Sequence, residues 1–372
     1  MRRFRSGDLT AAQAAEELQI TPRRFYQLYL SFLKAIGRRQ GESWSLGTSG
    51  GDHRRPWPEG CRALLEKLLR AKVSYSAAAS EVLRLLHHRM DRATVRRFAL
   101  AHGLAPAKTT GARQPVRRWQ TQKVGQLWQY DASPHRWLPD QDWQPSLLNL
   151  LDDHSRYNLD ARLFEAETLL AHLDFLGGTF QVNGLPLVLY VDYHSFFFTH
   201  VPEAHTQLAT ALHFYGVSLR FAPTPQAKGK IERSHQVWQK RLPPLLRANG
   251  ITELPAANAL LDQLRRHRNE MEKHRELGTT PKAAWDLAKK EKRWALRPAP
   301  RCPWWPYVFS QQSRVTVGDD GKVAVGAQRL SVDAPPRTKV VRCLHPNGDI
   351  TVLKNPPDKK VMPVVLLSTR LC

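Results

Sequence analysis

The chain has 372 residues, 42% of them hydrophobic, which is enough for several domains with buried cores. Its net charge of +23 and sequence pI of about 10.3 favour a polyanionic partner. No apolar run approaches the ~18 residues of a membrane-spanning helix, and the four cysteines form no C-x-x-C pair. We therefore expect a soluble, intracellular protein without a structural zinc site.

The charge is distributed unevenly along the chain. Residues 1–126 carry 24 Lys and Arg against 9 Asp and Glu, and residues 241–372 carry 24 against 12. Residues 127–240 carry 8 against 12. A mildly acidic block between two basic ones is typical of a cation-binding core whose flanks hold a nucleic acid.

The first 37 residues are predicted to form a helix-turn-helix. An Ala- and Glu-rich helix precedes Thr21-Pro22, which is an N-cap followed by proline at the first helical position. The second helix is amphipathic, and three side chains off its apolar stripe suit contact with DNA: Arg23, Arg24 and Gln27. A small helical bundle with a solvated basic face is the alternative.

A second helical unit is predicted over 59–103, after a Gly-, Pro- and Arg-rich linker at 38–58. It resembles another helix-turn-helix-like DNA-binding domain. A basic linker at 104–122 follows, and we expect it to run along a DNA backbone. The DNA-contacting residues predicted for this part are Arg96, Arg97, Arg117 and Arg118.

Residues 123–245 are predicted to form an α/β domain. Strands and helices alternate there in the order β-β-β-α-β-α-β-α, which is the order of a ribonuclease-H-like fold. The predicted strands are Trp128–Trp137, Ser146–Asp152, Tyr157–Glu165, Pro186–Asp192 and Val217–Phe221.

Three carboxylates of this domain are candidate metal ligands and catalytic residues. Asp131 lies on the first strand, Asp192 ends the fourth, and Glu232 lies just inside the third helix. Carboxylate oxygens suit Mg²⁺, which takes one or two carboxylates together with substrate phosphates. The sequence therefore predicts metal-dependent phosphoryl transfer on a nucleic acid.

Helical spacing assigns different positions to the charged residues around Glu232. Lys228 shares its face at i−4 and is expected to approach the reacting phosphate, whereas Lys230 and Arg233 project elsewhere and are expected to bind DNA. The apolar stripe of the same helix is predicted to consist of Ala227, Ile231, Trp238 and Leu242.

Two further parts are predicted after the α/β domain. Residues 246–295 are expected to be a helical extension, and residues 309–355 alternate in short β runs with turns that suggest a small β-barrel of the SH3 type. The chain is thus multidomain, with all-α helix-turn-helix modules, an α/β core and a C-terminal barrel.

Four segments of the chain resemble bacterial insertion-sequence transposases with a retroviral-integrase-type catalytic core. They are Trp128-Gln-Tyr-Asp131, Leu151-Asp-Asp-His-Ser-Arg-Tyr157, Leu189-Tyr-Val-Asp192 and Pro225-Gln-Ala-Lys-Gly-Lys-Ile-Glu-Arg233. The resemblance implies that Asp131, Asp192 and Glu232 are the catalytic Asp-Asp-Glu triad, with Mg²⁺ as cofactor or Mn²⁺ in its place. It also implies end cleavage and strand transfer of an insertion sequence.

The resemblance extends to partners and location. It implies binding to the double-stranded terminal repeats of the element and to target DNA, as a homo-oligomer in the bacterial cytoplasm, at the nucleoid. The chain departs from the family's pattern at Tyr193-His194, which follow Asp192 where many relatives have Asn and then Gly or His.

Alternatives remain for both the site and the function. Asp152 and Asp153 end a strand and compete as metal ligands, although the family's Asp-x-x-Ser-Arg run is mainly structural. A domesticated transposase acting only as a sequence-specific DNA-binding protein is the main rival function, but its sign would be a missing triad acid. A nuclease of ribonuclease H type would not need two helix-turn-helix modules.

Overall fold

The computed structural model describes residues 1–37, 56–105, 119–139, 142–201, 204–223, 225–326 and 328–370. The chain divides into two compact units, Met1–Trp57 and Pro58–Cys372. The greater part of both predicted linkers lies outside the described residues, and so do Arg117 and Arg118.

In the N-terminal unit, the described residues 1–37 form three helices around a small core. Phe25 is fully buried, and the ring of Phe4 meets it edge-on at 5.0 Å. The Thr21 hydroxyl accepts a hydrogen bond from the Arg24 amide, so the predicted N-cap is confirmed. The first helix, Arg2–Arg5, was not predicted from the sequence. The helices are α1 (Arg2–Arg5), α2 (Ala11–Glu17) and α3 (Pro22–Gly37).

The helical domain predicted over residues 59–103 packs against the α/β core that follows it. Ser74 and Asp91 cap two of its helices through their side chains. Ser80 donates a hydrogen bond of 2.6 Å to Glu272 and thereby joins this unit to the core. Its helices are α4 (Cys61–Arg70), α5 (Tyr75–Leu86) and α6 (Arg92–Ala101). Use of either helical unit for DNA binding stays a prediction.

The core is a five-stranded mixed sheet in the order β3-β2-β1-β4-β5. Strand β1 is antiparallel to β2 and parallel to β4, and β4 is parallel to β5. The predicted ribonuclease-H-like α/β core is therefore present, with the catalytic-strand candidate β1 at its centre. The strands are β1 (Leu127–Pro134), β2 (Ser146–Asp152), β3 (Asn158–Phe164), β4 (Val188–Val191) and β5 (Ser218–Phe221).

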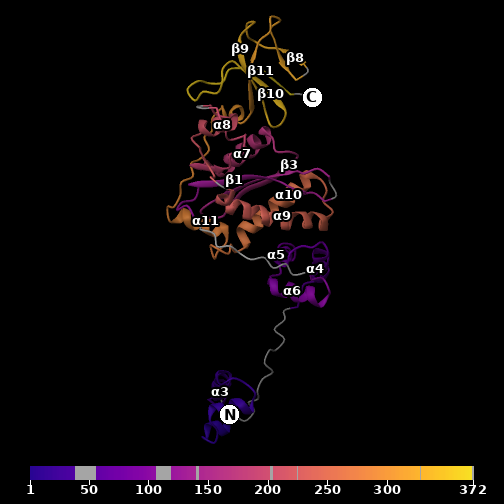
Figure 1. The fold of residues 1–372 in the computed structure, drawn as a ribbon, viewed down its shortest axis with the longest axis vertical. Coiled ribbons are helices and arrows are strands. Elements are labelled where there is room, and N and C mark those ends of the chain that lie inside the picture. Colours follow the sequence, from indigo (N-terminus) through magenta and orange to yellow (C-terminus); the bar gives the residue numbers. More distant parts are fainter. Residues whose placement is uncertain are drawn as a thin grey trace. The chain divides into compact units, whose positions relative to one another are not determined.

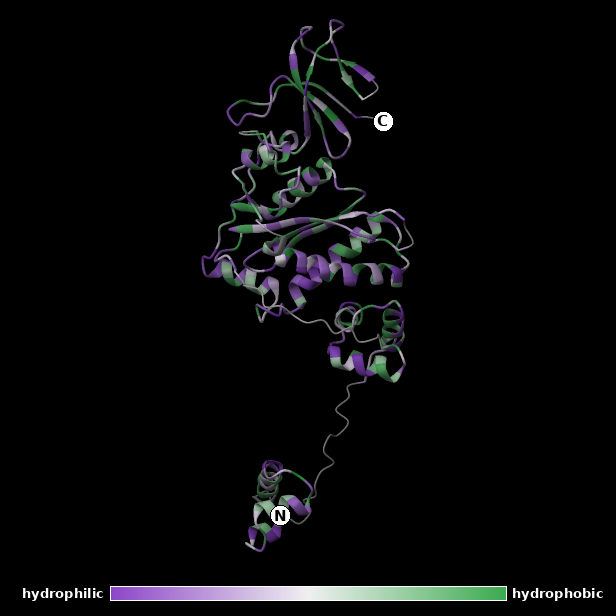
Figure 2. Cartoon of the chain, viewed as in Figure 1, coloured by the Kyte–Doolittle hydropathy of each residue, from purple (hydrophilic) through white to green (hydrophobic). Residues whose placement is uncertain are grey.

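Helices cover both faces of this sheet (Figure 1). Helices α7 (Leu169–Asn183) and α8 (Gln207–Phe214) lie on one face. The other face carries α9 (Gly229–Asn249), which follows a 3-10 turn η1 (Pro225–Lys228), and then α10 (Leu254–Met271) and α11 (Pro281–Lys290). Figure 2 shows hydrophobic and hydrophilic residues mixed along α9, α10 and α11, as expected for helices with one face on a sheet.

The predicted apolar stripe of α9 faces the sheet. Ile231, Trp238 and Leu242 are all fully buried, and Ala227 is partly buried. The helix continues through Pro243 and Pro244 to Asn249, beyond the predicted end of the core at residue 245.

The C-terminal part forms two sheets, so the predicted closed barrel is not confirmed. The four-stranded sheet has the order β11-β10-β9-β6, and β7 pairs with β8 alone. Strand β11 lies beyond the predicted boundary at residue 355, after a Pro- and Lys-rich loop that follows β10. The elements are α12 (Trp305–Val308), β6 (Gln311–Thr316), β7 (Lys322–Val325), β8 (Gln328–Ser331), β9 (Lys339–Leu344), β10 (Asp349–Leu353) and β11 (Val365–Arg370).

One hydrophobic core joins the α/β domain to the segment that leads into the C-terminal sheets. Trp305 and Phe309 pack against Tyr215, which ends α8, and Phe309 also meets Phe180 of α7. Among the described residues, every helix is too short or too polar to cross a lipid bilayer.

Trp238→Ala is expected to lower the free energy of unfolding of the core by about 3–5 kcal/mol, because it leaves a large cavity between α9 and the sheet. Urea unfolding followed by circular dichroism measures the change. Lys240→Ala, an exposed position two residues away, is the control and should change stability by less than about 0.5 kcal/mol. Equal effects in the two variants would contradict the packing of α9 described above.

Candidate active site

Two of the predicted acids lie at the same level of the sheet. Leu127 pairs with Val188 and Gln129 with Tyr190 in the parallel β1–β4 ladder. Continuing this register brings Asp131 level with Asp192, the residue directly after β4. The parallel pairing of two strands far apart in the sequence therefore places these two carboxylates side by side.

A lysine bridges the two carboxylates. The Nζ atom of Lys228 lies 2.5 Å from Oδ1 of Asp131 and 3.5 Å from Oδ2 of Asp192. The Lys228 side chain is 5% exposed, whereas that of Asp192 is 53% exposed. The site is thus closed by protein on the side of Lys228 and open to solvent on the side of Asp192.

The third acid lies on the helix face that contacts Asp131. Lys228, Glu232 and His235 occupy positions i, i+4 and i+7, which share one helical face. The outer two both approach Asp131, since His235 Nδ1 lies 3.5 Å from its Oδ2. Glu232 lies between these two residues in the sequence and is half-buried.

The burial of the site changes the proton affinity of its groups. Desolvation raises the pKa of Asp131 to about 6, with Asp192 adding to the rise, although the Lys228 ammonium opposes it. Desolvation also lowers the pKa of His235 to about 3, so this imidazole is neutral at pH 7. Lys228 therefore supplies the positive charge closest to Asp131.

The donor set is suited to a hard divalent cation. It consists of carboxylate oxygens, and a cationic ammonium already bridges two of them. Among the residues that the structure describes, no group of three or more His, Cys, Asp or Glu side chains is arranged around a common metal position. Asp131 and Asp192 would hold a metal, with Glu232 as the third candidate.

A polar network beside Asp131 could not be predicted from the sequence. The Tyr130 hydroxyl lies 2.6 Å from Nδ1 of His172, whose Nε2 lies 3.2 Å from a carboxylate oxygen of Glu167. Glu167 precedes α7 and contributes to the raised pKa of Asp131. Glu167 lies near Asp131 because α7 packs across the sheet, and no local sequence motif indicates this contact.

Asp152 and Asp153 have structural partners. Asp152 accepts hydrogen bonds from the Ser155 amide and hydroxyl and from the Gly125 amide, at 2.7–2.9 Å. Asp153 accepts hydrogen bonds from the Thr121 amide and from the Gln129 side chain, both at 2.8 Å. Both acids are fully buried, which supports their interpretation as structural residues.

Lys230 lies in a different environment from the predicted one. Its Nζ is 2.5 Å from Oδ1 of Asp153 and 4.4 Å from the centre of the Trp119 ring. The buried Asp153 carboxylate requires a compensating charge, and Lys230 provides it. This position favours a structural role in place of the predicted contact with DNA.

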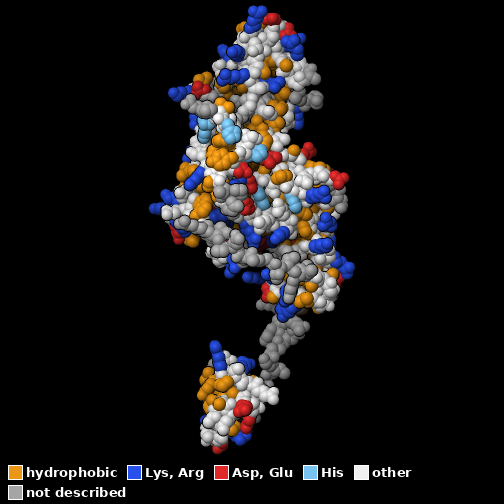
Figure 3. All heavy atoms as spheres, in the orientation of Figure 1, with side chains coloured by type: hydrophobic (Ala, Val, Ile, Leu, Met, Phe, Trp, Pro, Cys, Tyr) orange, Lys and Arg blue, Asp and Glu red, His pale blue; other side chains and the backbone are white. Residues whose placement is uncertain are grey.

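Lys228, also predicted to bind DNA, is buried against Asp131 and Asp192. The remaining predicted DNA-binding side chains within the described residues are on the surface. Arg23, Arg24 and Gln27 are exposed on α3, Arg96 and Arg97 on α6, and Arg233 on α9. Figure 3 shows Lys and Arg side chains spread over the visible face, with a small group of acidic side chains among them near the middle of the core.

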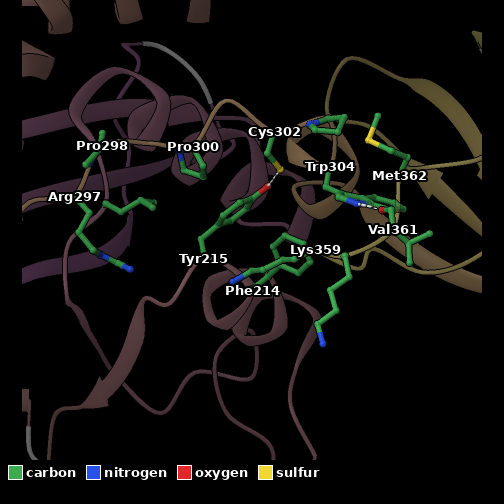
Figure 4. Close-up of a pocket in the computed structure, with 13 residues that line it drawn as sticks. Phe214, Tyr215, Arg297, Pro298, Pro300, Cys302, Trp304, Lys359, Val361 and Met362 are labelled. Atoms are coloured by element: carbon green, nitrogen blue, oxygen red, sulfur yellow. Dashed lines mark hydrogen bonds between the residues drawn. The ribbon is translucent and has the colours of Figure 1, made fainter.

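A cavity of about 450 Å³ lies apart from these acids. It is bounded by the end of α8, the segment from Arg297 to Trp304, and residues 359–362 (Figure 4). Tyr215, whose hydroxyl lies 3.6 Å from Sγ of Cys302, lines it together with prolines. None of Asp131, Asp192 and Glu232 contributes to its wall.

The structure thus combines a five-stranded mixed α/β core with two carboxylates that lie level on adjacent parallel strands. No known protein-family model matches the sequence. The chain is 29% identical over 225 residues to "Putative transposase y4bF" of Sinorhizobium fredii, covering 55% of this chain and 49% of that protein. It is 35% identical over 148 residues to the transposase for insertion sequence IS1202 of Streptococcus pneumoniae, covering 37% and 31%.

Two solved structures show a distant likeness. The magnesium complex of the HTLV-2 integrase catalytic core domain has a TM-score of 0.35 and 15% identity, covering 43% of this chain and 95% of that one. The simian T-cell lymphotropic virus intasome in complex with a PP2A regulatory subunit has a TM-score of 0.39 and 13% identity, covering 79% and 99%.

The resemblance to insertion-sequence transposases that the sequence predicted is confirmed by the curated relatives. The chain spans about half the length of one of these proteins and about a third of the other.

Lys230→Met is expected to lower the free energy of unfolding by about 3 kcal/mol, because it leaves the Asp153 carboxylate buried without its cation. Affinity for DNA should stay at the wild-type value. Urea unfolding and a DNA-binding titration measure the two quantities. Arg233→Met removes an exposed charge from the same helix and should barely change stability. Weaker DNA binding by Lys230→Met at unchanged stability would instead support the role predicted from the sequence.

Proposed function

We propose that the protein is a DNA transposase that catalyses metal-dependent end cleavage and strand transfer of an insertion sequence. The observation that carries this proposal is the pair Asp131 and Asp192, level on adjacent parallel strands and sharing one cationic partner. The helix that carries Glu232 contacts the same edge through Lys228 and His235. The similarity to insertion-sequence transposases supports DNA as the substrate.

Each of the three acids would have a different role at this site. Bound Mg²⁺, or Mn²⁺ in its place, would activate a water molecule and stabilise the entering and leaving oxygens of the phosphodiester. Asp131 would hold the metal together with Asp192, and the exposed Asp192 would face the DNA. Glu232 would complete the ligand set from α9. No covalent protein intermediate is required.

The flanking parts would hold the DNA. The basic faces of α3 and α6 suit the terminal repeats of the element, and the net charge of +23 suits the backbones of both element and target. Synapsis of two DNA ends would require a homo-oligomer. The alternative is a DNA-binding protein that has lost catalysis, and cleavage assays separate the two.

Asp131→Asn, Asp192→Asn and Glu232→Gln are each expected to abolish strand cleavage of element-end DNA while leaving DNA affinity nearly unchanged. The reason is that these acids hold the metal, whereas the basic flanks supply affinity. Gel-based cleavage with Mg²⁺ and a parallel binding titration measure both quantities. Asp142→Asn, at an exposed position outside the site, is the control and should cleave normally.

Near-normal cleavage by any of the three variants would remove that residue from the proposed triad. Specific DNA binding without cleavage by the wild type would favour the non-catalytic alternative.

Replacement of Arg23 and Arg24 together by Ala is expected to weaken binding to element-end DNA and to reduce its salt dependence. Each lost phosphate contact flattens the slope of log K against log salt by about 0.9, so two contacts reduce it by about 1.8. Fluorescence anisotropy at several salt concentrations measures the slope. Arg337→Ala, at an exposed arginine that is not assigned to DNA, is the control. An unchanged slope in the double variant would reject α3 as a DNA-binding element.

A further inference from the structure

The position of Lys228 raises a question that the proposed chemistry leaves open. Its ammonium contacts Asp131 and Asp192 at 2.5 and 3.5 Å, which is where a metal bound by the same two carboxylates would have to lie. Its side chain is nearly as buried as the core itself. Lysine and metal therefore cannot both occupy the space between these two acids.

We propose that Lys228 is a placeholder cation, whose ammonium holds Asp131 and Asp192 together in the metal-free protein and must be displaced when a divalent metal binds. The inference rests on the function proposed above, because it presumes that the site takes such a metal. Lys228 then competes with the metal and sets the metal concentration at which the site fills.

The electrostatics of the site require a cation in the metal-free state. Two carboxylates at the same level of adjacent strands repel each other, and partial burial of Asp131 strengthens the repulsion because little water screens it. His235, another basic side chain beside Asp131, lies 3.5 Å from that carboxylate, farther than the 2.5 Å of Lys228. Lys228 relieves the repulsion and keeps both side chains turned toward one point.

The position of Lys228 also allows its release. It is the last residue of the 3-10 turn η1 and the N-cap of α9, one helical turn before Glu232. Its four-carbon stem can turn the ammonium away from the carboxylates without moving α9. A displaced ammonium would remain beside Glu232, where the charge of a DNA phosphate would attract it.

Lys230 offers a matched comparison two residues away. It also contacts a buried aspartate, Asp153, at 2.5 Å. The partners of Asp153 are backbone and side-chain donors of the surrounding structure, and it is not among the candidate metal ligands. Loss of either lysine removes a buried ion pair, but only loss of Lys228 should alter metal binding.

The test compares Lys228→Met with Lys230→Met in the full-length protein without DNA. Thermal unfolding midpoints are recorded over a MgCl₂ series and then a MnCl₂ series, and isothermal calorimetry measures metal affinity directly. Both variants should unfold at lower temperature than the wild type when no metal is present. Suppose that the ammonium is away from the two acids in about one wild-type molecule in ten when no metal is bound. The metal site of Lys228→Met should then fill at a metal concentration about tenfold lower than that of the wild type.

Lys230→Met should fill at the wild-type metal concentration. An unchanged or higher filling concentration in Lys228→Met, with metal binding by the wild type, would overturn the placeholder role. Lys228→Gln retains a hydrogen-bond donor without the charge, and it gives the same comparison if the Met variant does not fold.

Asp131→Asn separates failure of this inference from failure of the proposed function. It should lose metal binding in both measurements. If the wild type binds no metal, or if Asp131→Asn binds as the wild type does, the metal site itself is rejected and the placeholder role with it.

Discussion

Two carboxylates brought level by a parallel strand pair are the constraint around which this core is organised. Asp131 and Asp192 are 61 residues apart along the chain, and the β1–β4 register makes them neighbours. Placing two acids together, one of them mostly buried, is unfavourable unless a cation joins them. Lys228 satisfies this requirement in the structure, and a divalent metal would satisfy it under the proposed function.

The surrounding elements hold this arrangement in place. Strand β1 is fixed on its other side by β2, where Asp131 lies opposite Asn149. Asn149 accepts a hydrogen bond from Asn158 and donates one to Ser234 of α9, so the sheet and the helix that carries Glu232 are linked through a buried polar chain. Trp238, one turn further along α9, anchors the helix in the core. The site is thus rigid on the protein side and open on the side of Asp192.

Sequence patterns predicted much of the core because each is local. The apolar run of β2 and the stripe of α9 indicated those elements directly, and the position of Asp192 after an apolar strand indicated a functional edge. Helical spacing predicted different roles for Lys228 and Lys230, and in the structure they contact different aspartates. The contact between Lys230 and Asp153 could not be predicted from the sequence. Asp153 follows a strand far away in the chain, and it needs a cationic partner only because the fold buries it.

Contacts between distant segments also explain the other differences between the predicted and the observed structure. The Tyr130–His172–Glu167 network forms only when α7 crosses over the sheet, and β11 pairs with β10 across a long Pro- and Lys-rich loop. The C-terminal strands alternate as barrel strands do, but alternation does not determine whether sheets close. Local patterns therefore predicted elements, whereas contacts between distant segments required the fold.

The most direct measurement is anomalous diffraction from crystals of the full-length protein grown with MnCl₂. The account predicts an anomalous peak within coordination distance of Asp131 and Asp192, on the side of Glu232, with the Lys228 ammonium withdrawn from both aspartates. Crystals saturated with Mn²⁺ that show no peak there, with Lys228 still bridging the two acids, would contradict it.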